Sequence, residues 1–172
     1  HGSEMIRLVA RFGRGLPAHV IPLELAALAA FGHAEMVAAQ AAGFAQVNIQ
    51  LAPCADRQVI ACEAALATAL GASVVLLDSD DPDAMADTLY AATPPAPVAT
   101  PVRPMGTRRQ IARQAATALN SPNETLTLPA GAPYGAVVVN TDDCTLCLSC
   151  VSLCPSGALG DNPDLPQLRF QE

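Results

Sequence analysis

Four of the six cysteines lie close together in the stretch CTLCLSCVSLCP, residues 144–155. Cys144, Cys147 and Cys150 are separated from one another by two residues, and Cys154 follows after three more and precedes Pro155. Thiolates at this spacing suit a [4Fe-4S] cluster, because one tight loop can place three sulfurs against three iron corners. The run therefore predicts electron transfer, and we expect no catalytic acid, base or nucleophile in this loop.

A small second domain must position this run. The sequence predicts a strand over Ala136–Asn140, then the cysteine loop, a short helix around Val151–Ala158 and a second strand over Gln167–Gln171. Pro155 prevents the helix from extending backward through Cys154 and fixes the direction of that side chain. The apolar residues between the cysteines, Leu146, Leu148 and Val151, are expected to shield the cluster from water.

Residues 134–172 resemble one half of a bacterial-type ferredoxin with two [4Fe-4S] clusters, the motif being the four cysteines and Pro155. The resemblance implies that Cys144, Cys147 and Cys150 ligate one cluster and that Cys154 ligates its neighbour. In that family a second C-x-x-C-x-x-C run follows, and the sequence stops at QLRFQE, where that run is expected. We therefore expect a piece of a longer protein in which the cluster is absent or incomplete.

Two alternatives remain open for the cysteine run. Four thiolates in tetrahedral geometry would also hold zinc as a structural ion. Cys54 or Cys62 would complete the first cluster if either served as a remote fourth ligand. However, Cys54 follows a proline and Cys62 lies in an alanine-rich helix. We expect each of these two to be a small buried thiol that packs as a hydrophobic side chain.

The sequence before the cysteine run predicts an α/β fold, a small layered domain with a partial parallel sheet. Residues 1–3 read as a tag remnant, 4–120 as the α/β domain, 121–133 as a linker and 134–172 as the partial ferredoxin-type domain. We expect strands at Met5–Phe12, Ala45–Leu51 and Ser73–Leu77, and helices at 21–43, 56–71, 81–92 and 107–120. The proline-rich stretch Thr93–Pro104 predicts an edge strand or a semi-rigid connection.

Composition excludes several classes of protein. The net charge is -7 and the chain has no lysine, which argues against nucleic-acid binding, since that needs a basic surface. No apolar stretch has the length of a membrane span. In a chain large enough to fold without disulfides, cysteines at metal-ligand spacing indicate reduced thiolates, and we therefore expect a cytoplasmic protein.

Four other features favour ordinary structural roles. GRGLPA, residues 13–18, has the outline of a dinucleotide fingerprint, but its prolines predict a turn. The acidic stretch Asp78–Asp83 is expected to cap a helix rather than to bind a cation. His19 and His33 are expected to pack or cap, and the arginines of TRRQIAR to form a solvated helix face or, second, a docking patch for an acidic redox partner.

The stretch Gly15–Leu51 resembles the interior of long bacterial 4Fe-4S binding proteins, which are associated with formate dehydrogenase systems. This resemblance implies a redox relay or maturation protein with a redox partner, such as a dehydrogenase. The alternative is a docking or assembly module that binds a dehydrogenase through its α/β domain and whose cysteines are structural or hold zinc.

Overall fold

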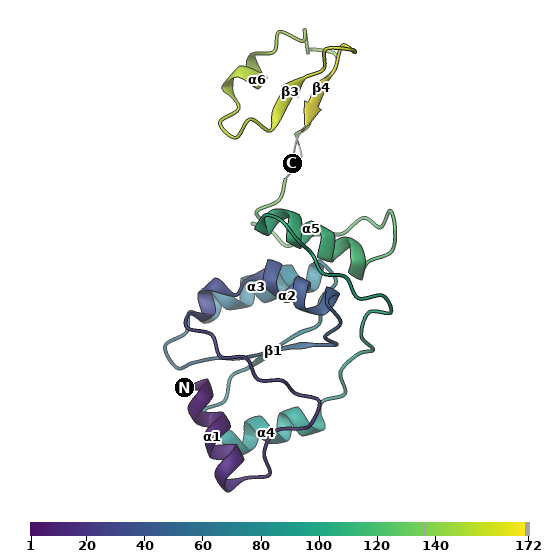
Figure 1. Ribbon diagram of the computed structural model, residues 1–172. Coiled ribbons are helices and arrows are strands. Elements are labelled where there is room, and N and C mark those ends of the chain that lie inside the picture. The colour runs from purple at the N-terminus through teal and green to yellow at the C-terminus, as the bar shows by residue number, and fades with distance from the viewer. Residues whose placement is uncertain (136, 171–172) are drawn as a thin grey trace. The chain divides into compact units, whose positions relative to one another are not determined.

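The chain forms two compact units. A computed structural model describes residues 1–135 and 137–170. The first unit is His1–Ala132 and the second is Pro133–Glu172 (Figure 1). Helices mixed with short strands, two of them in a small parallel sheet, give the α/β class that the sequence predicts.

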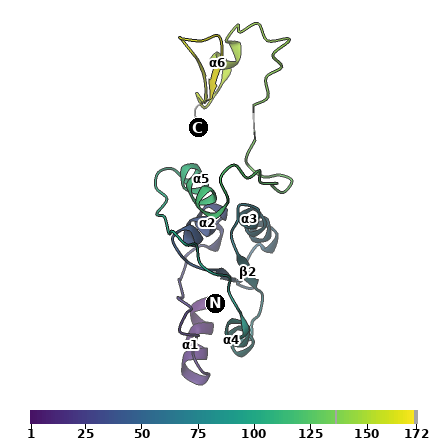
Figure 2. The same cartoon turned by 90° about the vertical axis from the view of Figure 1, so that its right-hand side faces the viewer.

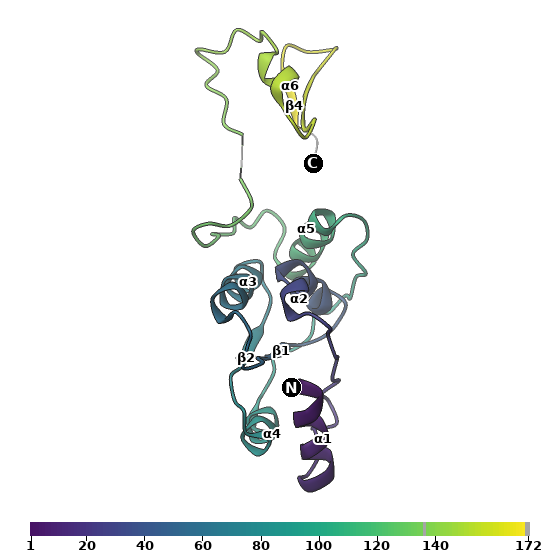
Figure 3. The same ribbon diagram turned by 90° about the vertical axis from the view of Figure 1, so that its left-hand side faces the viewer.

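The sheet of the first unit has two parallel strands, β1 (Val47–Gln50) and β2 (Val74–Leu77), with Val47 opposite Val74. Both lie within predicted strands, and the crossover between them contains α3 (Arg57–Ala69). Helices α2 and α3 lie on one side of the sheet, and α1 and α4 lie on the other (Figures 1 and 3). The sheet is thus the middle layer of three.

The structure confirms three predicted helices. Each of them has an N-cap residue whose side chain accepts a hydrogen bond from the first turn. The three helices are α3, α4 (Pro82–Ala91) and α5 (Arg108–Leu119), and α5 packs against α2. An N-cap oxygen satisfies a backbone N–H that the first turn would otherwise leave unpaired. The bonds are Val59 N–H to Asp56 Oδ1 (3.1 Å), Asp83 N–H to Asp81 Oδ1 (2.9 Å) and Gln110 N–H to Thr107 Oγ1 (3.3 Å).

The strand predicted over Met5–Phe12 is wrong, because this segment lies in helix α1 (Gly2–Phe12). Met5 and Val9, four residues apart, are both buried, whereas the charged residues between and around them are exposed. That spacing places one apolar stripe on one side of a helix. Helices α1 and α4 pack together on their side of the sheet (Figure 2).

The long helix predicted from residue 21 to residue 43 is also wrong in its first half. The structure has a single turn of 3-10 helix, η1 (Leu28–Ala30), and then α2 (His33–Ala41). Gly32 has an extended backbone, and its N–H donates to Glu35 Oε2 at 2.9 Å, which starts the helix at His33. The C-terminal end is as predicted, since Gly43 follows α2 with a φ of 110°.

The core of the first unit has two parts. One lies between α1, α4 and β2, and its buried members are Met5, Val9, Leu77, Met85, Ala86 and Leu89. The other side of the sheet is covered by α2, where Met36 and Val37 are fully buried. Residues 93–104 form a connection without a strand, and Val102 N–H donates to Ala41 O at 2.8 Å.

The second unit contains a short helix, α6 (Ser149–Leu153), and an antiparallel pair, β3 (Leu159–Asp161) and β4 (Leu168–Phe170). Strand β4 lies within the predicted second strand, whose last residue is outside the described residues. The helix is shorter than predicted and lies before Pro155, so the expectation that Pro155 stops the helix from extending backward through Cys154 is wrong. The residue before a proline is disfavoured in the helical conformation, and the helix accordingly ends at Leu153 with Cys154 as its C-cap. Residues 137–140 form no strand, contrary to the prediction, and Ala136 lies outside the described residues.

Among residues 1–135 and 137–170, no helix has both the length and the apolar character that crossing a bilayer requires.

Candidate metal centre

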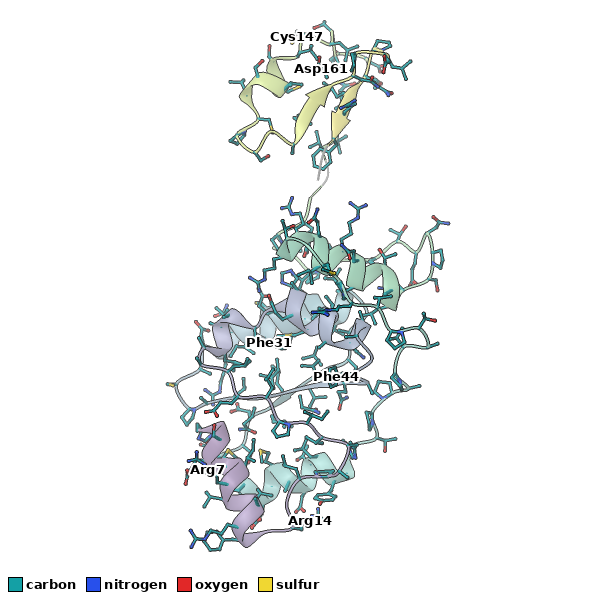
Figure 4. All side chains as sticks on the ribbon, viewed as in Figure 1. Arg7, Arg14, Phe31, Phe44, Cys147 and Asp161 are labelled. Carbon is teal, nitrogen blue, oxygen red and sulfur yellow. The ribbon has the colours of Figure 1, made fainter. Side chains whose placement is uncertain are left out.

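The four predicted ligands lie on and around helix α6. Cys144 and Cys147 are in the loop before it, Cys150 is in its first turn, and Cys154 is its C-cap residue (Figure 4 labels Cys147). Cys147 and Cys150 are exposed, Cys144 and Cys154 are partly buried, and all four are free thiols. The loop and helix therefore present four sulfurs within eleven positions of the chain.

A local turn fixes the entry to this loop. The backbone N–H of Cys144 donates to the carbonyl of Asn140 at 3.0 Å. The side chain of Asn140 closes the same turn, since its Oδ1 accepts from Asp142 N–H at 3.2 Å and its Nδ2 donates to Asp143 Oδ2 at 2.5 Å. An Asx-type turn of this kind sets the direction of the first cysteine without a hydrophobic core.

Two residues of the loop have a left-handed backbone. Leu146 has a φ of 55°, and Leu148, the N-cap of α6, has a φ of 60°. Alternation of right-handed and left-handed residues makes successive backbone N–H groups point into one concavity, an arrangement that binds anions and iron–sulfur clusters. Leu146 and Leu148, on either side of Cys147, supply the left-handed residues that such an arrangement needs.

Hydrogen bonds favour the thiolate of Cys147. Its Sγ lies 3.3 Å from the hydroxyl oxygen of Ser149. The Ser149 hydroxyl lowers the pKa of Cys147, as do the Ser149 backbone N–H and the Thr145 hydroxyl. Since the thiolate is the form that binds metal, this environment prepares Cys147 as a ligand.

A separate set of donors surrounds Cys154. Its Sγ lies 3.4 Å from Ser156 Oγ. The Ser156 hydroxyl, the Leu159 N–H and further N–H groups of Ser156 and Ala158 lower the pKa of Cys154 to about 7. Gly157, with a φ of 65°, makes the turn that brings these groups together. The two ends of α6 thus stabilise thiolates independently.

The donor set fits a [4Fe-4S] cluster in its chemistry, because such a cluster uses four thiolates with hydrogen-bond donors beside the sulfurs. The side chains themselves are not drawn together. In the described part of the chain, no three His, Cys, Asp or Glu side chains lie in an arrangement that holds a metal ion. The left-handed residues flank Cys147, and hydrogen-bond partners lie beside Cys147 and Cys154. The sulfurs, however, do not gather into a metal site in the described residues.

The remaining two cysteines are not buried, so the prediction that each packs as a hydrophobic side chain is wrong. Cys54 lies exposed in the loop after β1, and Cys62 lies exposed on α3. The buried side of α3 carries Ile60, Ala64 and Ala67, and Cys62 falls outside that spacing. Both thiols belong to the first unit.

The other sequence features have structural roles. Residues 13–18 follow a helix rather than a strand, so the context of a dinucleotide fingerprint is missing. Asp81 caps α4 as predicted, and Asp78 forms a two-pronged ion pair with Arg57, at 2.9 and 2.7 Å. In the basic cluster Arg108, Arg109 and Arg113, Arg108 pairs with Glu35 at 2.8 Å.

His33 is buried, as predicted, whereas His19 is exposed, so the prediction that it packs is wrong. The partner of His33 is one that the sequence does not reveal. The ring Nδ1 of His33 lies 2.6 Å from Glu63 Oε2, thirty positions away in the chain. Ser149 and Ser156 were also missed as hydrogen-bond partners of Cys147 and Cys154. A signal for them exists, because each follows a cysteine by two residues, which is within reach of a side-chain hydrogen bond.

No curated protein and no solved structure is detectably similar to the chain. Residues 137–160, which contain all four cysteines of the run, match the family model of the 4Fe-4S binding domain. The second unit therefore contains a ferredoxin-type module, its cofactor is a [4Fe-4S] cluster, and its chemistry is that of iron–sulfur electron transfer.

Proposed function

We propose that the chain transfers electrons through [4Fe-4S] clusters as part of a larger, multi-cluster redox protein. In this proposal Cys144, Cys147 and Cys150 hold one cluster, and Cys154 is a ligand of a neighbouring one. The observation that carries the proposal is the separation of the thiolate donors into two sets. Ser149, the first residue of α6, is hydrogen-bonded to Cys147, and Ser156, which follows the helix, is hydrogen-bonded to Cys154.

The residues of the chain prepare this site in three ways. The hydroxyl and N–H groups described above offset the negative charge of the sulfurs, and the number of such bonds tunes a reduction potential. The turn at Asn140 directs Cys144. Val151, a partly buried apolar side chain between Cys150 and Cys154, would limit the access of water when the site is filled. The bound cluster supplies a redox centre that takes up and releases one electron.

The partner in this proposal is another redox protein, and the resemblance of residues 15–51 favours a dehydrogenase of the formate dehydrogenase type. All six cysteines are free thiols. Thiols that must stay reduced for a cluster favour the cytoplasm as the compartment.

Anaerobic reconstitution of single variants tests the ligand assignment. Without oxygen, three thiolates are expected to hold the first cluster although the chain gives it no fourth ligand. Cys147→Ser and Cys150→Ser are therefore expected to abolish the iron uptake of the chain, whereas Cys154→Ser is expected to leave the first cluster in place. Cys62→Ser is the matched control, because Cys62 is an exposed thiol outside the run. If Cys154→Ser removes as much iron as Cys147→Ser does, all four cysteines ligate one cluster and the two-cluster assignment fails. Zinc bound without visible absorption would replace the electron-transfer proposal with a structural site.

A further inference from the structure

Three residues other than glycine have a positive φ in the described part of the chain: Asn123 (66°), Leu146 (55°) and Leu148 (60°). Asparagine visits this conformation readily, since its short side chain bonds to the local backbone. Leucine does not, because its Cβ meets the following carbonyl oxygen. The two strained leucines are the residues on either side of Cys147.

Packing does not explain the strain. The side chains of Leu146 and Leu148 are 36% and 37% exposed. The described residues of the second unit, 133–135 and 137–170, include no buried residue at all. A core that forces these leucines into an unfavourable conformation is therefore missing there. Backbone outliers without a packing cause are typical of functional sites.

The conformation instead determines where the polar groups of the loop lie. Leu148 is both the N-cap of α6 and the residue before Ser149, whose hydroxyl oxygen lies 3.3 Å from Cys147 Sγ. Its left-handed turn folds the chain back, so that Ser149 faces the preceding cysteine and α6 begins one residue before Cys150. Leu146 makes the equivalent turn between Cys144 and Cys147. At the other end of α6 the turn beside Cys154 is made by Gly157, where a positive φ costs little.

We propose that Leu146 and Leu148 are positioning residues for the cluster, and that their left-handed backbone, rather than their apolar side chains, sets the places of Cys144, Cys147 and Cys150. The inference rests on the proposed function, since it assigns these two residues to the same site. It differs from the expectation of an apolar shield, in which the size and hydrophobicity of the leucine side chains would matter and their φ would not.

Substitutions at position 148 separate the two roles. Leu148→Ile keeps the volume and the hydrophobicity, but its branched Cβ makes a left-handed backbone still less favourable. Leu148→Asn and Leu148→Gly remove the apolar side chain and accept that backbone. The same three substitutions apply to Leu146. The control is Leu153→Ile, because Leu153 lies in α6 and is 79% exposed.

The measurement is the ratio of cluster-loaded to cluster-free chain after reconstitution with a limiting amount of iron. This ratio is obtained from the iron content per protein. We expect the isoleucine variants at 146 and 148 to lower this ratio roughly ten-fold, and the asparagine and glycine variants to stay within about two-fold of the wild type. Leu153→Ile is expected to match the wild type. A second readout, the sign of φ from the amide-to-Hα NOE in NMR spectra of the empty chain, is expected to be positive at both leucines.

The inference is overturned if the isoleucine variants load the cluster like the wild type and the asparagine and glycine variants do not. That result would mean that the apolar side chains of the two leucines shield the cluster and that their φ does not matter. Negative φ at both leucines in the empty and the loaded chain would overturn the inference too. A wild-type chain that takes up no cluster overturns the proposed function together with the inference. If the wild type takes up the cluster but the variants do not follow the expected order, only the positioning role of the two leucines is overturned.

Discussion

The ring Nδ1 of His33 lies 2.6 Å from Oε2 of Glu63, and the same carboxylate oxygen accepts the backbone N–H of His33 at 2.7 Å. An ionised carboxylate only accepts hydrogen bonds, so Nδ1 carries the proton at this contact. The pair ties the first turn of α2 to the middle of α3, and the side chain of His33 is nearly buried. It is a polar connection between the two helices that cover one side of the sheet.

Removing this carboxylate should destabilise the first unit. Glu63→Ala removes the carboxylate oxygen that contacts the N–H and the ring Nδ1 of His33, and we expect a loss of about 1–2 kcal/mol in the free energy of unfolding. Glu63→Gln keeps an acceptor oxygen and should lose less. Urea denaturation followed by circular dichroism measures both. Equal stability of the alanine variant and the wild type would mean that water replaces the Glu63 carboxylate as the partner of His33 at no cost.

The same pair makes stability depend on pH. Burial alone would raise the pKa of Glu63, but the hydrogen bonds from His33 and the charges of His33 and Arg108 outweigh it and lower this pKa below its ordinary value of 4.5. A carboxyl group whose pKa is lower in the folded state stabilises the fold above the unfolded pKa, and this contribution disappears as the pH falls through the folded pKa. We expect the wild type to lose more stability below pH 4.5 than Glu63→Gln does, as measured by urea denaturation on both sides of that value.

Gly32 has no room for a side chain beside this pair. A Cβ at this position would lie 2.5 Å from Glu63 Oε2 and 2.5 Å from Arg108 Nη2. Both side chains can move, but moving them breaks the bonds to His33 and Glu35, and we expect Gly32→Ala to cost about 1–2 kcal/mol. In the Glu63→Ala background the same substitution should cost clearly less, which a double-mutant cycle measures. Additive effects would show that Glu63 does not limit the space at Gly32.

The reactivity of Cys154 in the metal-free chain should depend on Ser156. With a pKa of about 7, roughly half of the Cys154 thiols are thiolates at neutral pH, and thiolates are the form that alkylating reagents attack. Ser156→Ala removes the largest cause of the lowered pKa, so the midpoint of the alkylation rate against pH should move upward. Ser152→Ala is the control, since Ser152 bonds to Leu148 O rather than to a thiol. An unchanged midpoint in Ser156→Ala would assign the lowered pKa to the backbone N–H groups alone.

The sequence predicted the elements whose ends are set by local chemistry. The N-cap residues of helices α3, α4 and α5 are Asp56, Asp81 and Thr107, and such capping side chains can be recognised in the sequence without knowledge of the fold. It failed for Met5–Phe12, where an apolar run of strand length has the spacing of a helix. It failed again before Gly32, where a single 3-10 turn stands in place of the predicted helix and α2 begins only at His33. The side chains that leave no room for a Cβ at Gly32, Glu63 and Arg108, lie far away in the sequence.

For the candidate site, the cysteine spacing was enough to predict the cofactor, since ligand spacing in one loop is a local property. The left-handed leucines were not predictable, because leucine has no propensity for that conformation and only the structure shows its φ. The pairing of His33 with Glu63 depends on how α2 and α3 meet. The exposure of Cys62 depends on which side of α3 faces the sheet.

The central claim is that the cysteine run binds a redox-active [4Fe-4S] cluster, and the most direct test is anaerobic reconstitution of the wild type, Cys147→Ser and Cys62→Ser. We expect the wild type and Cys62→Ser to take up iron and sulfide, and to show broad visible absorption that dithionite bleaches and air restores. We expect Cys147→Ser to show neither iron nor colour. Zinc in place of iron, or equal iron uptake by Cys147→Ser and the wild type, would contradict the claim.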